Sequence, residues 1–81
     1  MQKYVVLNLH DNPSIYHYNE KGTLVYSFRI TKGGIYTNKS GSYADFEGCI
    51  EMNPNNHAII EAESIKDAFE IFYDKYPEYQ I

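Results

Sequence analysis

Cysteine is almost absent from this sequence: Cys49 is the only one, so no disulfide can form within the chain. A small domain without disulfides is suited to a reducing compartment. Long hydrophobic runs are absent too, since no stretch approaches the roughly 18 apolar residues that a membrane-spanning helix requires. Residues 1–3 lead directly into an alternating stretch that ends at His10, which leaves no apolar segment for a secretory signal. We therefore expect a soluble cytoplasmic protein that makes no membrane contact.

Recognisable catalytic and cofactor-binding motifs are lacking as well. The glycine-containing stretches 32–34 and 39–42 match neither a Walker A loop nor a dinucleotide-binding fingerprint, and no predicted helix follows them. The three histidines and Cys49 have none of the spacings of a zinc site. A nuclease that uses His10 and His17 is the one catalytic alternative. We predict that the protein is not an enzyme and needs no metal or cofactor.

The composition is that of one small globular domain covering residues 1–81. Hydrophobic residues make up 43% of the chain and charged residues 22%, which lies outside the disordered range. At 81 residues the chain is near the lower limit for a domain held by a single apolar core. Nine of its thirteen aromatic residues are tyrosine, which suits half-buried and interface positions. Lys outnumbers Arg six to one, which is typical of a low-GC genome such as that of a bacterium or its phage.

Charge is distributed unevenly between the two halves of the chain. Residues 1–42 contain five basic and two acidic residues, for a net charge of +3. Residues 43–81 contain two basic and nine acidic residues, for a net charge of −7, so the total of −4 conceals a strong asymmetry. Such an asymmetry favours one side of the surface for an oppositely charged partner. It predicts a protein partner with a basic surface.

Most of the first two-thirds of the sequence has the pattern of short strands separated by turns. Residues 24–30 show it best, because four large apolar side chains alternate with other residues. Residues 43–51 fit no clear pattern, and we interpret their centre, 48–50, as a short strand. The predicted strands are 3–9, 14–18, 23–30, a strand beginning at 35, and 57–62.

One amphipathic helix closes the chain. Ser64 can accept a hydrogen bond from the backbone N–H of Asp67, which marks the start of the helix, and Pro77 ends it after Tyr76. Apolar residues recur between these ends at spacings of three and four, so one side of the helix must pack on the sheet. We predict a small α+β domain: an antiparallel sheet of four to five strands with one C-terminal helix, about 64–76, on one face.

The side of this helix that faces away from the sheet is the first candidate surface. A solvated face is the simpler interpretation, because charge opposite the core is usual in an amphipathic helix. The functional interpretation is an acidic ridge that docks on a basic partner, with Ile71 as an apolar anchor beside the acids. The acidic ridge consists of Glu63, Asp67, Glu70, Ile71 and Asp74.

The sheet face that a single helix leaves uncovered is the second candidate surface. We expect residues 24, 26, 28 and 30, together with Val5, Leu7 and Leu9, to face the helix, so that their neighbours face outward. This outer face is interpreted as ordinary half-exposed tyrosine, as a homodimer or partner interface, or as a weak platform for nucleic-acid bases. It consists of Tyr4, Val6, Tyr16, Tyr18, Val25 and Arg29.

The basic, hydroxyl-bearing segment around residues 32–43 is the third candidate. It is interpreted either as a pair of hairpin turns or as a loop that contacts a small phosphorylated ligand. The residues of this candidate ligand loop are Lys32, Tyr36, Lys39, Ser40 and Tyr43.

These observations favour a non-catalytic protein-binding module that acts by stoichiometric contact, such as a phage or mobile-element accessory protein that inhibits a host factor. The alternative is a protein that binds or sequesters a small nucleotide-like ligand. A nucleic-acid-binding module ranks third, because an acidic domain is at an electrostatic disadvantage on a phosphate backbone.

Overall fold

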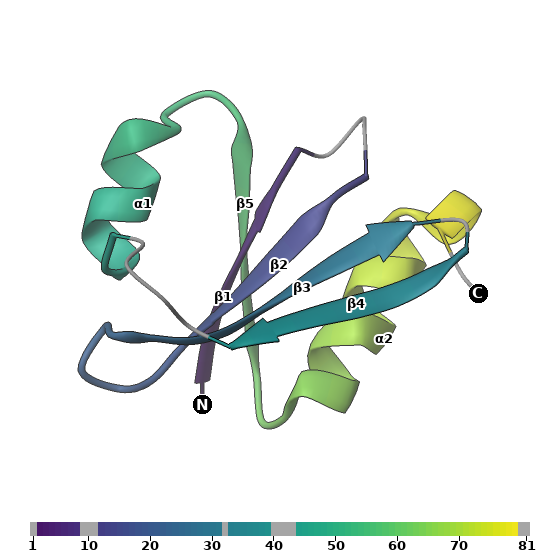
Figure 1. Cartoon of the computed structure of the whole chain (residues 1–81), viewed down its shortest axis with the longest axis horizontal. Coiled ribbons are helices and arrows are strands. Elements are labelled where there is room, and N and C mark those ends of the chain that lie inside the picture. The colour runs from purple at the N-terminus through teal and green to yellow at the C-terminus, as the bar shows by residue number, and fades with distance from the viewer. Residues whose placement is uncertain (1, 9–11, 32, 40–43, 80–81) are drawn as a thin grey trace.

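The computed structural model describes residues 2–8, 12–31, 33–39 and 44–79, and its architecture is a five-stranded sheet with helices packed against it (Figure 1). The strands run antiparallel in the order β4–β3–β2–β1–β5, so β4 and β5 form the two edges. The predicted small α+β fold is confirmed. No helix formed by the described residues is long and apolar enough to cross a membrane. The elements are β1 (Gln2–Leu7), β2 (Ser14–Tyr18), β3 (Leu24–Thr31), β4 (Gly34–Lys39), α1 (Phe46–Met52), β5 (His57–Ala62), α2 (Ile65–Lys75) and a short 3-10 helix (Pro77–Tyr79).

The C-terminal helix α2 begins and ends where the sequence predicts. The Ser64 hydroxyl accepts a hydrogen bond from the Asp67 N–H at 3.2 Å, and the Tyr76 N–H closes the last turn on the Phe72 carbonyl at 2.9 Å. The apolar side of α2 packs on one face of the sheet and forms the larger core. The buried residues of this core are Tyr4, Val6, Ile15, Ile30, Ile60, Ala62, Ala68 and Phe72.

A second helix, α1, covers part of the opposite face and occupies the segment in which we predicted a strand. The Asp45 side chain caps it by accepting a hydrogen bond from the Gly48 N–H at 2.8 Å. With seven residues α1 is too short for an apolar stripe to repeat, and a glycine in its middle lowers its helix propensity. The prediction of a strand at 48–50 is therefore wrong. The buried residues of the α1 core are Val5, Leu7, Tyr18, Leu24 and Cys49.

Strand β1 is buried on both faces, and its orientation is the reverse of the one that we predicted. Tyr4 and Val6 lie in the α2 core, whereas Val5 and Leu7 lie in the α1 core. All four side chains are at most 5% exposed. Because a helix covers each face here, β1 has no polar side that marks the outward direction, and the sequence alternation cannot choose between the two orientations.

A β-bulge redirects the start of β3. The pairing of β2 with β3 shifts between His17 and Tyr18, so that His17 lies opposite Tyr26 and Tyr18 lies opposite Leu24. Leu24 consequently joins the α1 core, while Tyr26 and Phe28 remain on the α2 side. The predicted orientation is right for these two aromatic residues and wrong for Leu24.

Candidate functional site

The first candidate site is a shallow groove of about 360 Å³ between edge strand β5 and helix α2. Four carboxylates and Ile71 of the predicted acidic ridge line it, and Glu61 at the end of β5 contributes a fifth carboxylate. We call this feature the acidic groove. Its lining residues are Glu61, Ala62, Glu63, Asp67, Glu70, Ile71 and Asp74.

The period of α2 explains why the helical acids lie together. Asp67, Glu70 and Asp74 are separated by three and four residues, so they occupy one side of the helix. Ala68 and Phe72 take the adjacent side and are fully buried against the sheet. Like charges at these spacings repel by about 0.2–0.5 kcal/mol per pair, so the arrangement costs stability unless cations approach it.

The negative charge of the acidic groove is not neutralised by ion pairs among the described residues, although Lys3 lies opposite Glu61 where β1 pairs with β5. In the described part of the chain, none of its five carboxylates forms an ion pair, although Lys66 and Lys75 lie on the same helix. Nor do three of these carboxylates, or any other described His, Cys, Asp or Glu side chains, gather closely enough to hold a metal ion. The charge is spread along the groove, which suits several cationic side chains better than a single ion.

The free edge of β5 borders the acidic groove. Among the described strands β5 pairs with β1 alone, so the backbone groups on its other side are not used by the sheet. Ile71 in the groove lining is 36% exposed, and Ile59 is 45% exposed on the face of β5 opposite to the buried Ile60. An acid such as Glu61 on an edge strand also discourages self-association, which is the simpler explanation for its position.

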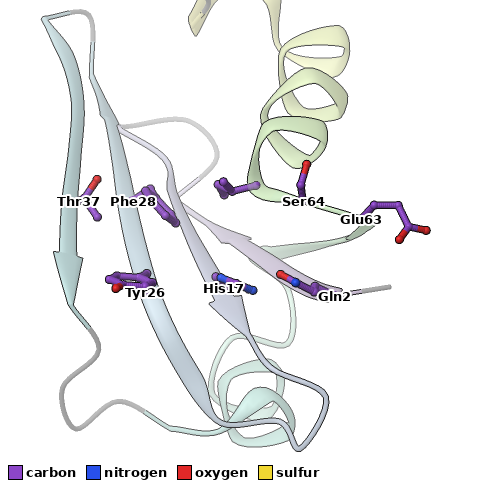
Figure 2. Close-up of a pocket in the computed structure, with 8 residues that line it drawn as sticks. Gln2, His17, Tyr26, Phe28, Thr37, Glu63 and Ser64 are labelled. Atoms are coloured by element: carbon purple, nitrogen blue, oxygen red, sulfur yellow. The ribbon is translucent and has the colours of Figure 1, made fainter.

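A second groove lies on the α2 side of the sheet, where the start of the helix does not cover β3 and β4. Its volume is about 440 Å³, and four adjacent strands and the start of α2 contribute to it (Figure 2). We call it the aromatic groove, because rings from β2 and β3 form much of its lining. Its lining residues are Gln2, His17, Tyr26, Phe28, Thr37, Glu63, Ser64 and Ile65.

A buried tyrosine supports the polar end of the aromatic groove. The fully buried Tyr4 donates its phenol O–H to Gln2 Oε1 at 3.0 Å, and the His17 ring stacks on the Tyr4 ring with centroids 4.7 Å apart. Burial, and secondarily the Asp67 carboxylate, raises the pKa of the Tyr4 phenol. Burial lowers the pKa of His17, so the imidazole at this end of the groove is neutral at neutral pH.

The aromatic rings of the groove are held by contacts beneath them. The Tyr26 and Phe28 rings lie 6.3 Å apart at an angle of 39°, and Phe28 meets Phe69 of α2 edge-to-face at 5.6 Å. The rings of the groove are half-buried, so each keeps one part against the protein and another part open. This gives a fixed aromatic surface that a flat molecule can contact.

The predicted outer face does not exist as one surface. Tyr4 and Val6 are buried under α2, and Tyr18 is buried in the α1 core, where its hydroxyl donates to the Ala44 carbonyl at 3.2 Å. Tyr16 packs half-buried beside the same core. The prediction of a shared face is wrong because β1 faces the opposite way, which places Tyr4 and Val6 under α2, and because α1 covers Tyr18 on the other face. Of the remaining two residues, Arg29 is exposed and Val25, at the bulge, lines a separate hollow.

The candidate ligand loop is described only in part. Tyr36 lies in β4 with 57% of its surface exposed, and Lys39 is the last residue of that strand. Lys32, Ser40 and Tyr43 lie outside the described residues. The ligand-loop hypothesis therefore stays a prediction.

Sequence reasoning missed the aromatic groove. We expected the helix to cover residues 24–30 of the sheet, but α2 buries Ile30 and leaves Tyr26 and Phe28 partly open. The available signal was the alternation itself, which places Tyr26 and Phe28 on one face of β3. Their proximity to Gln2 and Thr37 depends on the order of four strands, which the alternation does not contain.

No protein-family model, no curated protein sequence and no solved structure matches this chain. We therefore infer the function from the shape and chemistry of the two grooves.

Proposed function

We propose that this protein is a non-catalytic binding module that captures a basic, extended segment of another protein at the acidic groove. One observation carries the proposal: five carboxylates without ion-pair partners among the described residues line a groove beside a free sheet edge. A stoichiometric contact of this kind is also how an accessory protein that inhibits a host factor acts.

The free edge of β5 supplies the first part of the proposed interaction. An extended segment can add to an open sheet edge through main-chain hydrogen bonds, which give affinity without depending on sequence. Ile59 and Ile71 offer exposed apolar surface for the side chains of such a segment. The edge therefore fixes the path of the bound chain.

The carboxylates supply the second part, which is selectivity for basic residues. Asp67 and Asp74 are seven residues apart on α2, about 10 Å along the helix axis. An extended chain advances about 3.3 Å per residue, so that length corresponds to about three residues of the partner. Lys or Arg residues at alternate positions can thus each reach a carboxylate, and the field of the groove speeds their encounter.

Peptide binding tests the proposal. The probe is a short fluorescent peptide that alternates Lys and Val, and the comparison probe alternates Glu and Val. Binding is measured by fluorescence anisotropy, once with the full parent chain and once with its double variant Glu70→Lys/Asp74→Lys. We expect the variant to bind the Lys peptide at least about tenfold more weakly, a loss of about 1.4 kcal/mol, without a lower melting temperature.

The matched control is Glu47→Lys/Glu51→Lys on α1. It makes the same charge change at the same helical spacing, on residues that are exposed and distant from the acidic groove. Equal loss of binding in both double variants would mean that only net charge matters and would remove the groove from the proposal. Strand pairing is tested separately with Lys peptides N-methylated at alternate amides. If both methylated series bind as well as the parent peptide, edge pairing is wrong.

A further inference from the structure

We propose that the aromatic groove is a second, independent binding site. Its ligand is a free nucleobase or a nucleoside, which is planar in its base and carries no phosphate. The inference does not rest on the acidic groove, because different elements and different chemistry form the two sites.

The construction of the groove favours a small rigid ligand. Gln2, His17, Phe28 and Thr37 belong to β1, β2, β3 and β4, and Ile65 begins α2. Side chains held by paired strands keep their relative positions better than side chains on loops. The volume of about 440 Å³ lies in the range of small-molecule sites and is open at one side.

The aromatic lining favours a flat ligand. Tyr26 and Phe28 expose ring surface to the groove, and the edge-to-face contact of Phe28 with Phe69 fixes the deeper ring. Flat heteroaromatic rings stack on such side chains whatever the identity of the base, which is how single bases bind aromatic platforms. A branched aliphatic ligand of equal size gains less from this surface.

The polar groups favour a ring with hydrogen-bonding edges. Gln2 uses its Oε1 to accept from Tyr4, so its amide nitrogen remains a donor oriented by a buried partner. The His17 ring forms no hydrogen bond with any described residue, and its stacking on Tyr4 holds its plane. Figure 2 shows both groups at the same side of the groove, with Thr37 opposite. A nucleobase offers acceptors and donors on its edges that match these groups.

The charge around the groove favours a ligand without phosphate. Glu63 is the only charged side chain among the described residues of the lining, and its carboxylate points away from the groove (Figure 2), toward the acidic side that it also lines. Although the start of a helix attracts anions, the Ser64 cap and the Asp67 carboxylate already occupy that position in α2. A phosphate group at the start of α2 is repelled by the nearby Asp67 and Glu63 carboxylates.

Amide NMR spectra of the nitrogen-labelled full chain test the proposal. The probes are the four ribonucleosides, their monophosphates, and cyclohexanol as a non-planar molecule. We expect at least one nucleoside to produce saturable shifts at His17, Phe28, Thr37 and Ile65. The corresponding monophosphate should bind at least about threefold more weakly, and cyclohexanol should give no saturation.

A variant that fills the groove provides the decisive control. Thr37→Trp places a large ring on an exposed strand position that faces the groove, and Tyr36→Trp places the same ring on the next residue, on the other face of β4. We expect Thr37→Trp to weaken nucleoside binding at least about tenfold and Tyr36→Trp to leave it unchanged. The charge variant Glu70→Lys/Asp74→Lys should also retain nucleoside binding, which separates this site from the proposed function.

Three results would overturn the inference. The first is the absence of saturable shifts with all four nucleosides. The second is binding that Thr37→Trp does not weaken, or that the monophosphates share at equal strength. The third is a shift of the groove amide signals with protein concentration when no probe is present. If Thr37→Trp abolishes that shift, the occupant of the groove is a second copy of the chain.

Discussion

The two faces of the sheet differ in how fully their helices cover them. On one face the seven-residue α1 packs over a small core that contains Cys49. On the other, the eleven-residue α2 packs over a larger core that contains Phe72 and lies beside both candidate grooves. A longer helix buries more surface, yet it crosses only part of a five-stranded sheet. Both candidate grooves lie beside α2, one at the start of the helix over β2, β3 and β4 and the other along its boundary with edge strand β5.

The largest expected effect concerns the two cores. Phe72→Ala should lower the free energy of unfolding by about 3–5 kcal/mol, because a fully buried ring is replaced by a cavity. Cys49→Ala, at an equally buried position under α1, should cost about 1 kcal/mol because it removes a single heavy atom. Urea denaturation of both variants measures the difference. Equal losses would contradict the dependence of the cost on the number of buried atoms removed.

The second expected effect concerns the two helices as charged surfaces. Glu70→Lys/Asp74→Lys should weaken binding of the Lys peptide at least about tenfold, and the matched α1 variant should change it less than about twofold. Raising the salt concentration from about 50 mM to about 500 mM should weaken the peptide complex and leave the nucleoside complex nearly unchanged. Salt sensitivity of both complexes, or of neither, would contradict the separation of the two grooves.

The third expected effect concerns the two helix caps. Asp45→Ala and Ser64→Ala should each cost about 0.5–2 kcal/mol. Asp45 should be the more costly, since its charged side chain accepts at 2.8 Å and the Ser64 hydroxyl accepts at 3.2 Å. Thermal unfolding gives the two values. A larger cost at Ser64 would show that the start of α2 depends on its cap more than on its packing.

The smallest expected effect is a pH dependence on the α2 side. Burial lowers the pKa of His17 in the folded state, so below the ordinary value of about 6.5 the unfolded chain takes up the proton first. The contribution of His17 to folding stability is therefore complete above that pH and declines as the pH falls through it. The groups facing His17 are Tyr4, Tyr26 and the residues of the adjacent hollow, among them Glu20 and Lys21.

Substitution isolates this effect from the titration of the many carboxylates. His17→Gln should reduce the loss of stability between about pH 8 and about pH 5.5 by a few tenths of a kcal/mol. The parent chain, measured under the same conditions, provides the comparison. Urea denaturation at both pH values measures this. If His17→Gln loses as much stability as the parent chain over this pH range, the pH dependence has its origin elsewhere.

Local patterns were enough for α2 and for much of the sheet. The cap at Ser64, the apolar repeat and Pro77 fixed the limits of the helix, and the turn residues separated strands at 14–18 and 57–62 as observed. Asp67, Glu70 and Asp74 could be assigned to one surface because the helical period alone groups them. The short helix α1 was missed because seven residues contain too few repeats to distinguish a helix from a strand.

The sequence by itself determined which residues share a face of one element, because that depends only on the period of the backbone. It therefore determined the amphipathic helix, its acidic side and the alternation of β3. The tertiary structure alone decided which way β1 faces, that Leu24 packs in the α1 core, and that Glu61 lies beside the acids of α2. It also decided that Gln2, His17, Phe28 and Thr37 meet in one groove. These outcomes depend on pairing between residues far apart in the chain, and the energy that selects among pairings comes from burying both faces of the sheet at once.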